Sequence, residues 1–293
     1  MKKEKAIGQS RRWANMKHEF RHNKQAIFAA VFVLTVVIIS LLVVFVKADP
    51  DAIDMGKMLQ PASGKHWLGT DELGRDYLLR VIYGGRVSLL VGVLAMFTSV
   101  VIGVVVGTVA GYFGGFIDSL LMRAVDIFTA IPWIIMVTVV ALLFKKGLAS
   151  IIIVIGCFSW MEIARLVRAE TLSSREREYV QYAKFIGIPS MAIIRNHVIP
   201  TVFPTIITAA TAAIANAIMT ESALSFLNLG VQQPMSSWGS LLQTAQQNLQ
   251  QAPLMAVVPG ILIILTVYSF NKLGDVLRVF VEPRITAGDK YDA

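Results

Sequence analysis

The sequence predicts an all-α integral membrane protein with about six transmembrane helices. Of its 293 residues, 55% are hydrophobic and only 16% are charged, and the mean hydropathy is +0.64. Soluble domains carry roughly a quarter charged residues, so this composition favours a bilayer. A bilayer core about 30 Å thick needs about 20 apolar residues in a helix. Six stretches reach or approach that length, and we place them at 26–46, 87–112, 124–144, 148–168, 198–220 and 254–273.

Basic residues predict how these helices cross the membrane. With the N-terminus inside, the inner segments hold 19 Lys and Arg and the outer segments hold 8, which favours a topology with both chain ends in the cytoplasm. The positive-inside pattern also explains the net charge of +8, and no nucleic-acid-reading module is visible, so no nucleic-acid partner is expected. The predicted order is a basic cytoplasmic N-terminus (1–25), a first span (26–46), an extracytoplasmic loop (47–86), a five-helix core (87–280) and a cytoplasmic tail (281–293).

The first span begins that order as an uncleaved anchor, because no small-residue cleavage pattern follows it in VVFVKADPD. The second span carries Gly103, Gly107 and Gly111 at intervals of four residues. This spacing leaves one helix face flat, so that another helix backbone can approach closely. The approaching helix belongs either to this chain or to a partner subunit.

Ionisable and polar residues near the span ends each allow two interpretations. Asp126, Glu162 and Arg165 fall near the cytoplasmic ends of the third and fourth spans, where charged groups pair or reach water. They form either a gating network on a translocation path or a simple interfacial salt bridge with snorkelled charges. Glu221 and Ser222, at the outer end of the fifth span, either line a translocation mouth or belong to an ordinary helix end.

The outer segment 221–252 contains no Lys or Arg and has a framework of Gly230, Pro234 and Gly239 around Trp238. This pattern is typical of a shaped re-entrant or interfacial element rather than of a flexible linker. Trp238 serves equally well as an anchor in the aromatic belt of the membrane.

Residues 175–198 form a charged stretch between two apolar runs and cannot cross the bilayer as one helix. They are expected at the cytoplasmic surface. Within 176–186, one helix face at positions i, i+3, i+4 and i+7 carries the apolar side chains Tyr179, Tyr182, Ala183 and Ile186, which predicts an amphipathic helix.

This surface helix should end at Gly187 and Pro189, and Ser190 is expected to cap a second short helix that begins near Met191. Two short helices with exposed aromatic side chains could form a docking knob for another protein. The alternative is an interfacial helix that lies on lipid headgroups.

Four segments carry a resemblance to a known family. Residues 181–200 resemble the cytoplasmic coupling loop of ATP-binding-cassette importer permeases, whose pattern is Glu-Ala-Ala, three residues, Gly, nine residues, Ile, any residue, Leu-Pro. Gln181, Tyr182 and Ala183 stand at the first three positions, Gly187 at the glycine and His197 to Pro200 at the end. Gln181 replaces the acid of the pattern, so this chain lacks that carboxylate. Residues 68–92, 110–132 and 221–242 are similar to the C-type subunit of the dipeptide/oligopeptide/nickel branch.

The resemblance implies the permease fold of a type I importer and a set of functional residues. The coupling loop, 175–198 with the first turn after it, would contact the ATPase subunits through Glu178, Tyr179, Gln181, Tyr182, Ala183, Gly187, Ile188, Met191, His197 and Pro200. A translocation path or gate would use Asp126, Glu162, Arg165, Glu221 and Ser222.

The implied partners are a homologous B-type permease subunit, two ATP-binding subunits, an extracytoplasmic substrate-binding protein and membrane lipids. The implied location is the bacterial cytoplasmic membrane. The substrate would be a dipeptide or oligopeptide, and nickel or another small solute is the alternative within the same family.

Enzymatic chemistry is not expected. The phosphate-binding pattern GxxxxGK[ST] does not occur, so ATP and magnesium should bind partner subunits and no cofactor should bind this chain. No catalytic constellation and no metal-ligand spacing rises above chance. A secondary transporter would show mid-span acids and an internal repeat, which we do not see. A receptor subunit is the further alternative, and transport assays with and without ATP would separate it from a permease.

Overall fold

The computed structural model describes residues 23–46, 48–143 and 147–281, and regular structure in these ranges is helical. Most of the predicted N-terminal segment and of the tail lies outside the described residues. The helices are α2 (Lys24–Leu42), η1 (Val43–Phe45), η2 (Met55–Lys57), α3 (Tyr77–Phe113), α4 (Gly115–Ala130), α5 (Trp133–Leu143), α6 (Leu148–Phe158), α7 (Trp160–Arg175), α8 (Glu178–Phe185), α9 (Ser190–Ile193), η3 (Ile194–Val198), α10 (Ile199–Phe226), α11 (Trp238–Gln247) and α12 (Leu254–Val281).

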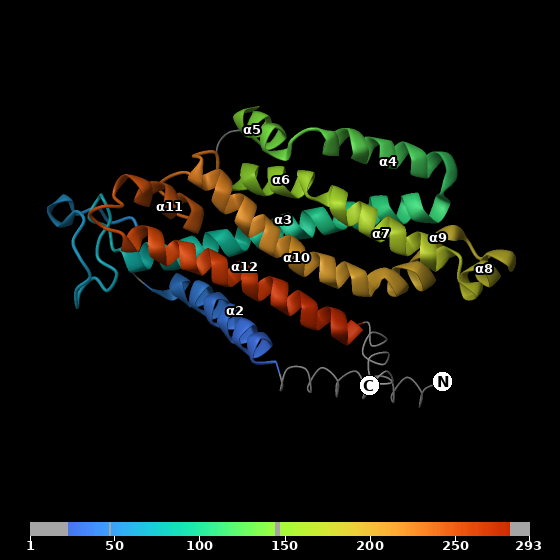
Figure 1. Ribbon diagram of the computed structural model, residues 1–293, viewed down its shortest axis with the longest axis horizontal. Coiled ribbons are helices and arrows are strands. Elements are labelled where there is room, and N and C mark those ends of the chain that lie inside the picture. Colours follow the sequence, from blue (N-terminus) through green and yellow to red (C-terminus); the bar gives the residue numbers. More distant parts are fainter. Residues whose placement is uncertain (1–22, 47, 144–146, 282–293) are drawn as a thin grey trace, which may run out of the picture.

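The long helices run along the longest axis of the molecule (Figure 1). α8 and α9 lie at one end, and α11 lies at the other end beside the segment that precedes α3. α4 and α5 flank the bundle on one side, and α2 flanks it on the opposite side. Within the described ranges, five helical segments are long and apolar enough to cross a membrane, or six if the bent pair α4–α5 counts as one span. This agrees with the predicted fold class.

The second membrane helix begins ten residues earlier than predicted. Asp76 caps the N-terminus of α3 by accepting a hydrogen bond of 3.0 Å from the Leu79 amide, so the expected loop 47–86 ends before Tyr77. The charge of Arg80 obscured this start. The Arg80 side chain is buried and forms ion pairs with Asp51 (2.6 Å) and Asp71 (3.3 Å).

The third span is not the straight helix predicted at 124–144. Its place is taken by α4 and α5, which meet at an angle of 86°. Ile131 adopts an extended backbone before Pro132, as residues that precede a proline tend to do. Because Pro132 also has no amide hydrogen, the helix ends here and restarts at Trp133.

The fourth and fifth spans are longer than predicted. α6 and α7 are separated by Ser159 and together form a candidate span from Leu148 to Arg175, where the prediction was 148–168. α9, η3 and α10 form a candidate span from Ser190 to Phe226, where the prediction was 198–220. The expected second short helix is therefore the first turn of a long one.

The glycine stripe of α3 packs against α7 of the same chain. A Cβ atom built on Gly103 would lie 2.7 Å from the Ile163 Cβ, and one built on Gly107 would lie 2.5 Å from the Ala164 carbonyl oxygen. At Gly111 the nearest atom is the Thr171 Cβ at 2.7 Å. The backbones of α3 and α7 are thus in direct contact, which only glycine allows at these positions.

Candidate coupling surface and translocation cavity

The surface helix α8 has well-defined ends. Glu178 lies in its first turn and Lys184 in its last, so both charges complement the helix dipole. Gly187 follows with φ of +79° and donates its amide to the Lys184 carbonyl, while Ile188 donates to the Ala183 carbonyl. These two bonds form a Schellman motif, which ends α8 at the position expected from the sequence.

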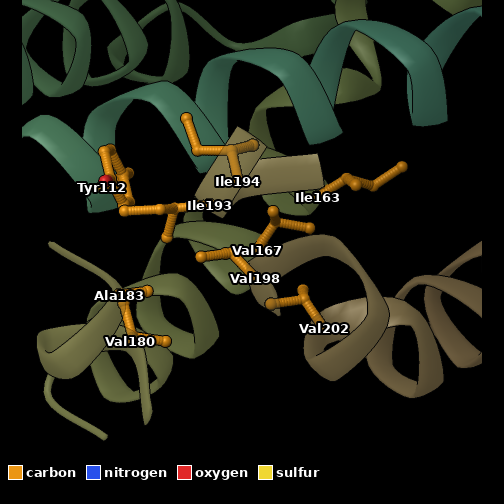
Figure 2. Packing of buried hydrophobic residues seen from close by; sticks show 9 residues of the cluster. All are labelled: Tyr112, Ile163, Val167, Val180, Ala183, Ile193, Ile194, Val198 and Val202. Atoms are coloured by element: carbon orange, nitrogen blue, oxygen red, sulfur yellow. The ribbon is translucent and has the colours of Figure 1, made fainter. Parts of the chain in front are cut away.

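The inner face of α8 is not the face that was predicted. Val180 and Ala183 are buried, with Ala183 only 3% exposed, in a cluster with Tyr112, Ile193 and residues of α7, η3 and α10. Figure 2 shows this cluster between α8 and the helices above it. Ala183 therefore anchors α8 to its own chain, and the expectation that it faces a partner is wrong.

The outer face of α8 carries large apolar side chains. Tyr179, Tyr182 and Ile186 are exposed, and Phe185 is 88% exposed. Met191 on α9 adds a side chain that is 73% exposed. Apolar side chains grouped in this way mark an interaction surface more often than scattered ones do. We call these five residues the α8 patch.

Polar contacts tie α8 to the ends of two membrane helices. The Gln181 side-chain amide donates a hydrogen bond of 2.9 Å to the Arg175 carbonyl at the end of α7. A glutamate, the usual residue at this position of the pattern, could not donate that bond. The Tyr179 and Thr201 hydroxyl groups share a hydrogen bond of 3.0 Å, and the Tyr179 ring lies 6.1 Å from the His197 ring.

The start of α9 differs from the prediction in one detail. Ser190 is its first residue, the N-cap is Pro189, and no side chain caps this end. Pro200 lies in the first turn of α10, where a missing amide hydrogen costs little in a helix that begins there. In this chain α10 is not a free helix start, because α9 and the π-helical η3 directly precede it.

A cavity of 710 Å³ lies between the bent pair α4–α5 and the helices α6, α7 and α10. Its walls are mostly apolar and include Phe128, Trp133, Met136, Met161 and Met219. Its polar lining includes Thr129, Ser159, Glu162, Arg165, Asn216 and Thr220. Ligand cavities commonly combine this size with apolar walls and a few polar groups.

Two ion pairs connect α4 to α7. The Arg165 guanidinium lies 2.8 Å from the Asp126 carboxylate at the edge of the cavity, and both side chains are about half exposed. Arg168 donates two hydrogen bonds to Asp118 one turn further along, at 2.5 and 2.6 Å. Asp126, Glu162 and Arg165 are therefore brought together, with Glu162 on the cavity wall.

Glu221 and Ser222 do not line a translocation mouth. Both are buried, and Glu221 is 0% exposed. The Ser88 hydroxyl donates to the Glu221 carboxylate at 2.9 Å and the Ser225 hydroxyl donates at 2.7 Å. Both residues belong to the interior of the protein, where the Glu221 carboxylate joins α10 to α3 through Ser88.

The outer loop before α11 is held by the same network. The Trp238 amide donates to the Ser88 hydroxyl at 3.2 Å, and its indole N–H donates to the Val81 carbonyl at 3.1 Å. Trp238 is buried, so it belongs to the shaped element and is not an anchor in the aromatic belt. No sequence pattern predicts the role of Ser88, because its partner Glu221 lies 133 residues away in the chain.

Residues 103–287 match the family model described as the binding-protein-dependent transport system inner membrane component. The chain belongs to this permease family. The relatives found include the oligopeptide transport system permease protein OppC of Haemophilus influenzae, 38% identical over 277 residues, which are 93% of this chain and 88% of the relative. OppC of Escherichia coli K12 is 36% identical, and the glutathione transport system permease protein GsiD of Escherichia coli O6:K15:H31 is 37% identical; each alignment covers 93% of this chain and 91% of the relative.

Solved structures agree with this membership at the level of the fold. The inward-facing MetNI methionine ABC transporter superposes with a TM-score of 0.55 at 20% identity, covering 69% of this chain and 97% of the other. A second crystal form gives a TM-score of 0.56 at 21% identity. At this identity the superpositions show that the bundle described above shares the fold of that transporter chain.

Proposed function

We propose that this permease is one of two transmembrane subunits of an ATP-driven importer of short peptides in the bacterial cytoplasmic membrane. The observation that carries the proposal is the identity of 36–38%, over 93% of the chain, to permeases named for oligopeptide and glutathione transport. Both names denote short peptides. The charge asymmetry of the sequence supports a topology in which the end with α8 faces the cytoplasm and the end with α11 faces outward.

The α8 patch is the surface on which we expect ATPase subunits to dock. It exposes Tyr182, Phe185 and Met191 at the cytoplasmic end, and its inner face is fixed to the membrane helices through Val180 and Ala183. Because α8 is also tied to α7 by Gln181, a force on the patch would reach that helix. ATP and magnesium would bind the partner subunits, and this chain would hold neither.

The remaining partners follow from the same proposal. A homologous B-type permease subunit would complete the translocation path on the open side of the cavity. A substrate-binding protein would dock at the outer end. The network around Glu221 and Trp238 holds the start of α11 there, and Arg80 holds the segment before α3 through its ion pairs with Asp51 and Asp71.

Uptake assays test the function directly. The genes of the importer and of its binding protein would be expressed in a bacterial host that lacks its own peptide permeases, and uptake of labelled di- and tripeptides, glutathione and a nickel chelate would be measured. We expect peptide uptake that stops when the partner ATPases carry an inactive phosphate-binding lysine. Uptake of the nickel chelate without any peptide uptake would contradict the proposal, and so would uptake that does not need ATP.

A further inference from the structure

Glu162 lies on α7, near the middle of the candidate span Leu148–Arg175, and its side chain is exposed. Its neighbour Ile163 packs against Gly103 of α3, ten residues before α3 ends at Phe113. Ten helical residues span about 15 Å, which is about half of the hydrocarbon thickness of a bilayer. The predicted span 148–168 put Glu162 near its cytoplasmic end, whereas Glu162 is near the middle of the longer candidate span Leu148–Arg175.

A carboxylate near the middle of a membrane span needs a partner. In the described part of the chain, Arg165 is paired with Asp126 and Arg168 with Asp118, and no cation lies within ion-pair distance of Glu162. Among the described residues that line the cavity, Glu162 is therefore an acidic residue with no ion-pair partner. Ionisable residues inside membrane spans are costly and usually mark the path of a substrate or ion.

The surroundings of Glu162 also favour a ligand. It lies one turn after Ser159, the single residue that separates α6 from α7. Both Ser159 and Glu162 line the 710 Å³ cavity. Met136, Met161 and Met219 line it too, and flexible thioether side chains adapt to ligands of different shape.

Together these features fit a ligand with a constant cationic group and variable apolar parts. We propose that Glu162 contacts the substrate and holds the free α-ammonium group of a short peptide inside the cavity. This inference rests on the proposed function, because it names the part of the peptide that the membrane subunit recognises. Arg165 is already neutralised by Asp126, so the cavity offers the carboxyl end of a peptide no comparable unpaired charge.

Photo-crosslinking tests this contact without the binding protein, so that peptide selection by that protein cannot hide the effect. The complete transporter in lipid nanodiscs would be incubated with alanyl-benzoylphenylalanyl-alanine, with its amine free or acetylated. Benzophenone reacts readily with methionine, and mass spectrometry would map the label to the segments 128–137, 155–166 and 209–220, which line the cavity.

We expect acetylation to lower labelling of the cavity about tenfold or more, the range for loss of a charge-assisted hydrogen bond. Glu162→Gln should lower labelling by the free-amine peptide to the same extent and abolish the difference between the two peptides, while Glu162→Asp should keep part of it. Glu170→Gln is the matched control, because Glu170 lies on the same helix outside the cavity lining and its loss should change nothing.

Three results would overturn the inference: equal labelling of the wild type and Glu162→Gln, equal labelling by free and acetylated peptides, or no cavity label in a preparation that imports the peptide once binding protein is added. Loss of the second permease subunit during purification of Glu162→Gln, with the peptide label unchanged, would instead assign Glu162 to a cation of that subunit. Failure of the wild-type complex to import any peptide would reject the proposed function itself.

Discussion

The contact between α3 and α7 can be tested with one methyl group. Gly107→Ala would place a Cβ atom 2.5 Å from the Ala164 carbonyl oxygen and 3.0 Å from the Arg168 amide nitrogen. Both are backbone atoms, so no rotamer change relieves the overlap, and α7 must move back by nearly 1 Å to restore ordinary contact. Gly260→Ala is the matched control in α12, because the nearest atom to its Cβ is a Leu242 methyl carbon at 4.0 Å.

The two substitutions should shift stability in opposite directions. Each gains about 0.5–1 kcal/mol because alanine is the better helix former. At Gly107 the overlap costs about 1–3 kcal/mol, as overpacking does in other cores, so the net loss should be about 1–2 kcal/mol. Midpoints of heat inactivation, followed by size-exclusion chromatography of the purified complex, should fall by a few degrees for Gly107→Ala and stay or rise for Gly260→Ala. A Gly107→Ala protein as heat-resistant as the control would refute the direct packing of these backbones.

Three further predictions concern the two ends of the molecule. Gly187 has φ of +79°, and no atom lies within 4 Å of a Cβ built on it. The β-branched side chain in Gly187→Val should therefore cause backbone strain of about 1–2 kcal/mol rather than a clash, which should loosen α8 and lower transport per ATP. Asn tolerates this conformation, so equal coupling in Gly187→Asn and Gly187→Val would contradict the reasoning. Burial raises the pKa of Glu72, so the folded state binds the carboxyl proton more tightly than the unfolded state does. The free energy of unfolding should therefore fall as pH rises from the ordinary carboxyl pKa through the raised one. Glu72→Gln should flatten this trend, measured as the melting temperature against pH. In a Cys157→Ser background, an impermeant maleimide added to intact cells should label Met235→Cys but not Phe185→Cys, and labelling of both would overturn the topology.

Hydropathy predicted where the helices lie better than where they begin and bend. A window of residues counts Arg80 as a polar charge, and cannot register that Asp51 and Asp71 neutralise it in the fold. The start of α3 at Tyr77 was therefore missed. The bend at Ile131 had a local signal, the following Pro132, but a proline within an apolar run also occurs in kinked helices that cross the membrane, so the angle could not be derived.

In the candidate site, too, local features could be predicted from the sequence and tertiary contacts could not. The end of α8 at Gly187 was predictable because a left-handed residue after a helix is a local property. The burial of Ala183 was not, because the neighbours that cover it come from α9, η3 and α10. The internal position of Glu221 also depends on distant residues, since Ser88 donates to it from another helix. Helical spacing identifies a face, and only the tertiary contacts decide what that face meets.

The position of α7 links the two parts of the candidate site. Its C-terminal end holds α8 through Arg175, and its N-terminal turns carry Glu162 and Arg165 on the cavity wall. Between them, the backbone of α7 packs directly on the glycine stripe of α3. If ATPase subunits move α8, α7 can slide a small distance along α3 as a rigid helix, as packed helices do in shear motions. The ion pair of Arg165 with Asp126 would then be strained or broken, which opens the edge of the cavity that α4 borders.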